Sequence, residues 1–100
     1  MQYKIIVSQE AFDMLKEHIA FIANVDKSAA ENAKKLIVES IKSLSEFPNR
    51  YPFFDEKYIP QNKYHKMFVE KRYLVLYQIK DDTVYVDYIL DCRQDYSWLV

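Results

Sequence analysis

Three cationic or phenolic residues near the middle and end of the chain could act on a phosphate group: Lys66, Arg93 and Tyr96. An arginine can clamp a phosphate through charge-assisted hydrogen bonds, and a tyrosine can donate a proton or stack on a base. Arg93 stands beside Asp91 and Asp95, so ion pairs that hold the end of the chain are favoured over a phosphate clamp. For Tyr96, a partly buried ring that anchors the last strand is an equally good interpretation.

Lys66 belongs to a segment that alternates like a strand, in which Tyr64, Phe68 and Glu70 share its face. A lysine that emerges from an apolar surface is more suggestive of a binding role than one in a run of charges. Snorkelling, in which the aliphatic stem covers apolar surface and the ammonium reaches water, explains it equally well.

Charge is distributed unevenly along a chain whose formal net charge is only -1. Residues 57–80 carry six cations and one acid, a net +5, whereas 81–100 sum to −4 and 8–31 to −3. A local basic segment can attract nucleic acid or an acidic protein partner even when the whole chain is neutral. An ordinary solvated strand face is an even alternative.

Several classes of site are excluded by composition. The 100 residues include no glycine, and P-loops, dinucleotide-binding turns and glycine-rich RNA-binding loops all need it. The single Cys92 rules out an internal disulfide and every multi-cysteine zinc pattern, and His18 and His65 are too far apart for a local metal motif. We therefore expect no cofactor and no metal. We expect His18 to be packed, and His65 to be exposed.

Length and hydropathy indicate one small domain spanning residues 1–100. No apolar run approaches the ~18–20 residues that span a bilayer, and the N-terminal residues lack the apolar core of a signal peptide. We expect a protein that stays in the cytoplasm and has no membrane partner.

The pattern predicts an α+β fold of order β-α-α-β-β-β. Ser8 is placed to cap a helix over 9–24, and a capping box at 28–31 begins a second helix over 28–46, with Ile37 and Ile41 central to its apolar stripe. Pro48 should end this helix, because the residue before a proline is displaced from the α region. Strands are expected over 2–7, 64–70, 73–80 and 84–90, with turns at 71–72 and 81–82. We predict an antiparallel helical hairpin on one face of an antiparallel four-stranded sheet, whose middle strand 73–80 is apolar on both faces.

At the level of whole segments the chain resembles the RelE/ParE superfamily of toxins from bacterial type II toxin–antitoxin systems. The resemblance rests on order and spacing: the opening strand Tyr3–Ser8, the helix start Ala11–Leu15, the segment Leu44–Pro52, the strand Tyr73–Ile79 and the closing segment Asp91–Tyr96. It implies a small toxin that is neutralised by a cognate antitoxin, whose extended or helical segment wraps the sheet and the hairpin.

The superfamily implies two activities: one branch cuts messenger RNA on the ribosome without a metal, and the other poisons DNA gyrase. By resemblance Lys66, Arg93 and Tyr96 would be the catalytic residues if the chain is a ribonuclease. Two departures count against that activity: Leu74 stands where an arginine usually follows the strand tyrosine, and Asp95 stands where some ribonucleases have a histidine. We therefore expect gyrase as the target, with the ribosome-dependent ribonuclease as the alternative and an inactive antitoxin-binding module as a third possibility.

Overall fold

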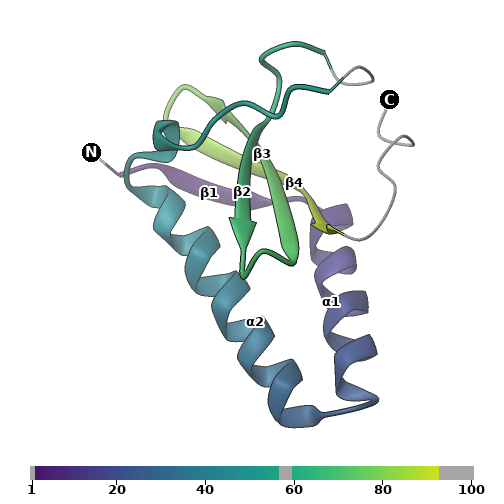
Figure 1. Ribbon diagram of the computed structural model, residues 1–100. Coiled ribbons are helices and arrows are strands. Elements are labelled where there is room, and N and C mark those ends of the chain that lie inside the picture. Colours follow the sequence, from purple (N-terminus) through teal and green to yellow (C-terminus); the bar gives the residue numbers. More distant parts are fainter. Residues whose placement is uncertain (1, 57–59, 93–100) are drawn as a thin grey trace.

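The computed structural model describes residues 2–56 and 60–92, and it has the predicted order of elements (Figure 1). Strand β1 (Lys4–Val7) leads into helices α1 (Gln9–Ala23) and α2 (Lys27–Lys42). Two short 3-10 turns, η1 (Ser43–Ser45) and η2 (Pro48–Arg50), follow α2. Strands β2 (His65–Val69), β3 (Tyr73–Lys80) and β4 (Thr83–Asp91) complete the described part of the chain.

The four strands form one mixed sheet of order β1-β4-β3-β2. β2, β3 and β4 pair antiparallel as expected, but β1 pairs parallel with β4, from Lys4 opposite Thr83 to Val7 opposite Val86. The expectation of a wholly antiparallel sheet was therefore wrong at this one pairing. The reason is that α2 returns the chain to the end of the sheet where β1 begins, as the 2.8 Å hydrogen bond from Tyr3 N to Ser45 O shows. β2 then starts from that end, and two tight turns give β4 the same direction as β1.

The helix boundaries follow local capping chemistry. The Ser8 hydroxyl accepts a 3.0 Å hydrogen bond from Ala11 N, which confirms the predicted N-cap of α1. In α2 the cap is Asp26, whose carboxylate accepts from Ser28 N and Ala29 N, and not the predicted Ser28. Regular α-helix also stops at Lys42, earlier than expected, because the chain tightens into η1.

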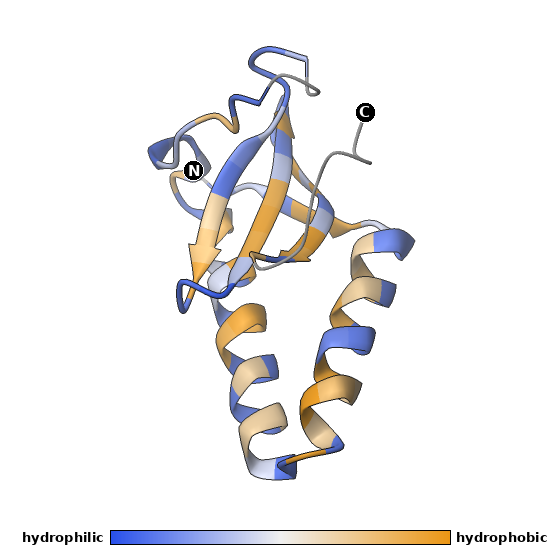
Figure 2. Ribbon diagram, turned by 45° about the vertical axis from the view of Figure 1, so that its right-hand side comes forward, coloured by the Kyte–Doolittle hydropathy of each residue, from blue (hydrophilic) through white to orange (hydrophobic). Residues whose placement is uncertain are grey.

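Both helices pack on one face of the sheet, and hydrophobic residues line the contact (Figure 2). Ile37 and Leu44 are fully buried there against β-strand residues such as Val75, Val84 and Ile89. A second apolar cluster occupies the opposite face, with the members Phe54, Tyr64, Leu74, Leu76 and Leu90. The central strand β3 is therefore buried on both faces, as its sequence predicted.

The turn between β2 and β3 lies one residue earlier than expected and has an uncommon composition. Glu70 and Lys71 both have positive φ angles, of 56° and 58°, and Arg72 N donates to Val69 O at 3.1 Å. Two consecutive positive φ angles identify a type I′ turn, which normally uses Asn-Gly because a Cβ atom is disfavoured in this region. The next turn, at 81–82, agrees with the prediction, and Asp81 also has a positive φ.

Truncation of the α2 stripe should be strongly destabilising. Ile37 has 0% of its surface exposed, so Ile37→Ala should lower the free energy of unfolding by about 2–4 kcal/mol through lost transfer energy and a residual cavity. Urea denaturation measures this, with the exposed Lys35→Ala on the same helix as the control. A midpoint that scarcely moves for Ile37→Ala would contradict the packing of α2 described above.

Replacing the strained turn should stabilise the protein. The double variant Glu70→Asn, Lys71→Gly supplies the preferred type I′ pair and should raise the free energy of unfolding by about 1–2 kcal/mol. The control Glu70→Gln, Lys71→Arg keeps both Cβ atoms and should leave the urea midpoint close to that of the parent. An equal or lower midpoint for the Asn-Gly variant would show that the turn is not strained.

Candidate functional site

The first candidate surface is the sheet face opposite the helices, which we call the open face and define by Lys66 and Phe68 of β2. His65, Met67 and Val69 turn toward the helices, so Lys66 and Phe68 turn the other way. Phe68 has 55% of its surface exposed, whereas Lys66 is half-buried.

Lys66 emerges from an apolar surface, as the alternation predicted. Its partner across the sheet is Leu76, and that of Phe68 is Leu74, both of them buried. Lys66 is also tied to the chain beside it, since its backbone N–H donates to Pro52 O at 2.9 Å. Of the three predicted site residues, the structure describes the position of Lys66 alone. Arg93 and Tyr96 lie outside the described residues, and so does Asp95.

Leu74 occupies the position where the ribonuclease branch was expected to have an arginine. Its side chain is 1% exposed and belongs to the apolar cluster of the open face. A charged group at this position would lose its hydration and would find no polar partner among the surrounding leucines. Burying a charge in this way is costly. This position therefore supplies packing and no phosphate contact.

Polar side chains of β3 and β4, Gln78 and Asp87, form a group that the sequence did not reveal. A β-bulge between Leu76 and Tyr77 makes Asp87 the extra residue on β4, and Gln78 Nε2 donates to Asp87 Oδ2 at 2.6 Å. Bulges re-aim side chains, and their positions depend on strand pairing. Alternation within a single strand could not have located this one.

Two tyrosines border this polar group. The rings of Tyr64 and Tyr88 meet edge to face with centroids 5.9 Å apart. Burial raises the pKa of Tyr64 above its ordinary range, and the nearby charge of Asp87 raises it further. Burial also raises the pKa of Tyr88, followed by the charges of Glu10 and Asp87. These shifts move the pKa of both phenols still further from neutral pH, so neither exchanges its proton readily near pH 7.

Both histidines have structural contacts. His18 Nε2 donates to Ile89 O at 2.9 Å, which ties α1 to β4 and confirms that His18 is packed. The expectation that His65 is exposed was wrong: its ring stacks on Tyr77 at a 5.3 Å centroid distance and lies 4.3 Å from Phe53. His65 Nδ1 is also within 2.8 Å of Tyr51 O. The aromatic loop folds back over β2 and buries this ring, a long-range contact that local sequence does not report.

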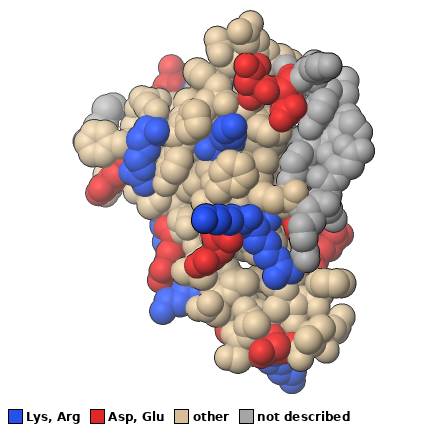
Figure 3. Space-filling model, viewed as in Figure 1, with Lys and Arg blue, Asp and Glu red and all other residues tan. Residues whose placement is uncertain are grey.

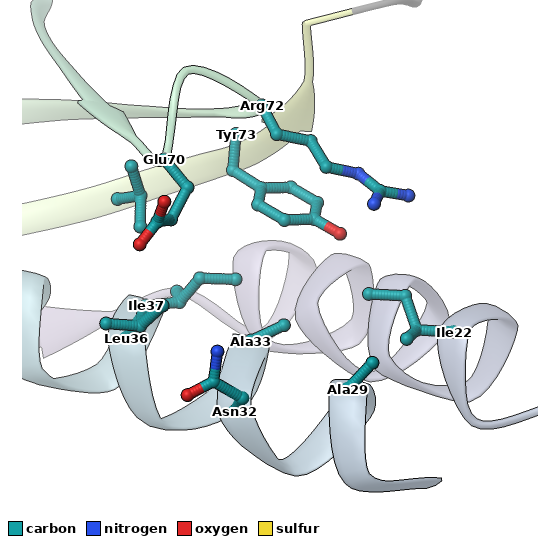
Figure 4. A pocket seen from close by; sticks show the side chains of 10 residues that line it. Ile22, Ala29, Asn32, Ala33, Leu36, Ile37, Glu70, Arg72 and Tyr73 are labelled. Carbon is teal, nitrogen blue, oxygen red and sulfur yellow. The ribbon is translucent and has the colours of Figure 1, made fainter. Parts of the chain in front are cut away.

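The second candidate surface is a groove of about 250 Å³ between the helical hairpin and the β2–β3 turn (Figure 4). We call it the hairpin groove. Its lining is mostly apolar, with polar groups from four residues, and comprises Ile22, Ala29, Asn32, Ala33, Leu36, Ile37, Val69, Glu70, Arg72 and Tyr73. Ala29, Ala33 and Leu36 line the α2 side, and Glu70 and Arg72 overhang from the turn.

Arg72 is the most distinctive group in the hairpin groove. Its Nε atom is buried and has no hydrogen-bond partner among the residues that the structure describes. The guanidinium carbon lies 5.3 Å from the centre of the Tyr73 ring, a cation–π contact that does not give Nε an acceptor. A buried donor without an acceptor is costly, so a carboxylate or carbonyl oxygen delivered into the groove would be stabilised there. Figure 3 shows cationic side chains over the sheet near this turn, with carboxylates beside them.

Other classes of site find no support in the described ranges 2–56 and 60–92. No group of three or more His, Cys, Asp or Glu side chains there could hold a metal ion. Within the same ranges, no helix is both long enough and apolar enough to cross a membrane.

Comparison with known proteins gives a family and a fold. Residues 5–96 match the family model described as the ParE toxin of type II toxin–antitoxin system, parDE. The structure superimposes on the chromosomal ParDE toxin–antitoxin system from P. aeruginosa with a TM-score of 0.74. That match covers 90% of this chain and 96% of that chain, at 15% sequence identity. No curated protein sequence matched this chain.

The family match spans nearly all of the chain, and the structural likeness supports the same fold. A type II toxin has a cognate antitoxin as its partner, in agreement with the partner expected from the sequence. The chain belongs to the ParE toxin family of type II toxin–antitoxin systems.

Proposed function

We propose that this toxin stops growth by binding DNA gyrase and does not itself cut messenger RNA. The observation that carries the proposal is the chemistry of the open face. Metal-free RNA cleavage needs cations around the phosphate and groups that exchange protons near pH 7. In the described residues of that face, Lys66 is accompanied by the buried Leu74 and by tyrosines whose pKa is raised.

The histidines do not supply the missing proton carrier, because His18 and His65 are both held in packing contacts. A gyrase poison needs a binding surface and no proton shuttle. The hairpin and the basic strand offer such a surface, and the ParE family match supports the same branch.

The ribosome-dependent ribonuclease remains the second candidate, because Lys66 does stand on an otherwise apolar open face. In that reaction Lys66 and Arg93 would stabilise the pentavalent phosphate, and Tyr96 would protonate the leaving oxygen. An inactive module that only binds antitoxin is the third candidate.

The gyrase proposal predicts trapped cleavage complexes. Purified toxin incubated with gyrase and supercoiled plasmid should produce protein-linked linear DNA, and the same toxin should leave ribosome-bound messenger intact in a toeprinting assay. Codon-boundary cuts that disappear in Lys66→Ala or Arg93→Ala, but persist in the remote control Lys35→Ala, would establish the ribonuclease instead. If expression of the toxin causes no growth arrest, the third candidate is favoured, an inactive module that only binds antitoxin.

We further propose that the antitoxin covers the open face around Lys66, Phe68 and Arg93 and continues into the hairpin groove. An acidic, apolar segment complements residues 57–80, with their net charge of +5, and the exposed Phe68 ring. A carboxylate on the same segment would give the buried Arg72 Nε its acceptor.

Hydrogen exchange on the toxin–antitoxin complex should therefore show protection of β2 and the β2–β3 turn relative to free toxin. Phe68→Ala should weaken antitoxin binding by about tenfold, equivalent to roughly 1.4 kcal/mol. Phe12→Ala on α1 is the matched control, since Phe12 is 48% exposed and belongs neither to the lining of the hairpin groove nor to the apolar cluster of the open face. Protection confined to residues 49–62 would contradict the proposed interface.

A further inference from the structure

Phe47 combines two features that are each unfavourable in an isolated monomer. Its backbone is left-handed, with φ 51° and ψ 53°, although it carries a bulky side chain and precedes Pro48. Its ring is also 76% exposed to solvent. The proline was expected to displace this residue from the right-handed α region, and it does so, but into the left-handed region where a Cβ atom is disfavoured.

The surrounding structure holds Phe47 in this conformation. On one side, η1 is tied to the start of β1 by the hydrogen bond from Tyr3 N to Ser45 O. On the other side, Pro48 is buried and its carbonyl accepts a 2.7 Å hydrogen bond from the Tyr77 hydroxyl. The turn is closed by Arg50 N, which donates to Phe47 O at 3.1 Å. The ring is therefore presented on a rigid support.

Neither the strain nor the exposure benefits the free toxin. Glycine or asparagine adopts the left-handed conformation more easily, and either residue would remove an apolar ring from water. Strained positions that the surroundings over-determine cluster at functional sites. A backbone that already holds the residue in place reduces the conformational entropy lost when its ring binds. The benefit of Phe47 is therefore expected in a complex.

The chemistry around Phe47 favours a protein pocket over a nucleic acid. Arg50 is occupied within the turn, since it donates to Glu46 O and to Ser43 Oγ and lies 5.0 Å from the centre of the Tyr51 ring. Glu46, next to Phe47, is exposed and would repel a phosphate backbone. An apolar pocket on a protein surface needs no free cation.

Phe47 is separated from the surfaces proposed for the antitoxin by face and by position. Its neighbour Pro48 contacts Tyr77, which faces the helices, whereas Lys66 and Phe68 face the opposite side of the sheet. Phe47 lies at the end of the sheet where β1 begins, whereas the β2–β3 turn and the hairpin groove lie at the other end of β2 (Figure 1). We propose that Phe47 is an aromatic anchor that inserts into an apolar pocket of the protein this toxin inhibits. The proposal rests on the proposed function in that it requires a protein target, and it names the residue that makes the contact.

The test is Phe47→Gly in the full chain, measured for stability, antitoxin affinity and toxicity. The urea midpoint should stay the same or rise, because glycine relieves the left-handed backbone, and antitoxin affinity should stay within twofold. The concentration of toxin needed to trap gyrase–DNA complexes should rise at least tenfold, and growth arrest on expression should weaken correspondingly. Phe47→Leu, which keeps an apolar side chain, should recover part of the activity.

Phe21→Ala is the matched control. Phe21 is 67% exposed on α1 in ordinary helical backbone, so its loss should change none of these measurements. The proposal would be overturned if Phe47→Gly kept full potency or lowered the urea midpoint. It would also be overturned if the variant lost antitoxin affinity to the same extent as potency, or if it lost affinity for DNA alone. If the parent toxin traps no gyrase and yet Phe47→Gly abolishes growth arrest, the gyrase proposal fails while the anchor stands.

Discussion

The burial of β3 on both faces is the constraint on which the other elements of this small domain depend. Tyr73, Val75 and Tyr77 face the helices, while Leu74 and Leu76 face the opposite side, and all five are buried. A strand buried on both faces needs two separate covers. The helical hairpin supplies one, and Phe54 and Tyr64, from the chain that leads into β2, contribute to the other.

This constraint also shapes the chemistry of the open face. Because Leu74 is needed as packing, the strand cannot present a cation at that position, and the lysine that stands among these apolar side chains, Lys66, belongs to the neighbouring β2. The same burial raises the pKa of Tyr64 and Tyr88 further above neutral pH. A surface of this kind is suited to binding more than to proton transfer, which connects the packing of the core to the proposed gyrase target.

The lack of glycine places strain at defined points of the backbone. In the described part of the chain, positive φ angles fall on Phe47, Asn62, Glu70, Lys71 and Asp81. Asparagine and aspartate tolerate this conformation, but Phe, Glu and Lys do not adopt it readily. These less suited residues stand where partners are proposed to bind: Phe47 as the target anchor, and Glu70 and Lys71 in the turn that overhangs the hairpin groove. The left-handed backbone at these residues lowers the stability of the free toxin, and we attribute its retention to the binding of partners at the same positions.

Much of the fold could be predicted because it depends on local chemistry. The Ser8 cap, the apolar stripe through Ile37 and Ile41, and the two-sided apolar pattern of β3 are all properties of neighbouring residues, and the structure agrees with each. The same reasoning correctly placed Lys66 and Phe68 on one face. The family resemblance, carried by the order of these segments, was confirmed as well.

What the sequence could not determine depends on contacts between distant segments. The parallel pairing of β1 with β4 follows from where α2 delivers the chain, and the burial of His65 follows from the loop that folds over β2. The bulge that re-aims Asp87, the unpartnered Nε of Arg72 and the left-handed Phe47 likewise appear only once strands are paired and helices packed. The sequence by itself determined the elements, the core and the family, because periodicity and capping act within a few residues. The tertiary structure decided which polar and strained groups meet a partner, because that depends on desolvation by residues far away in the chain.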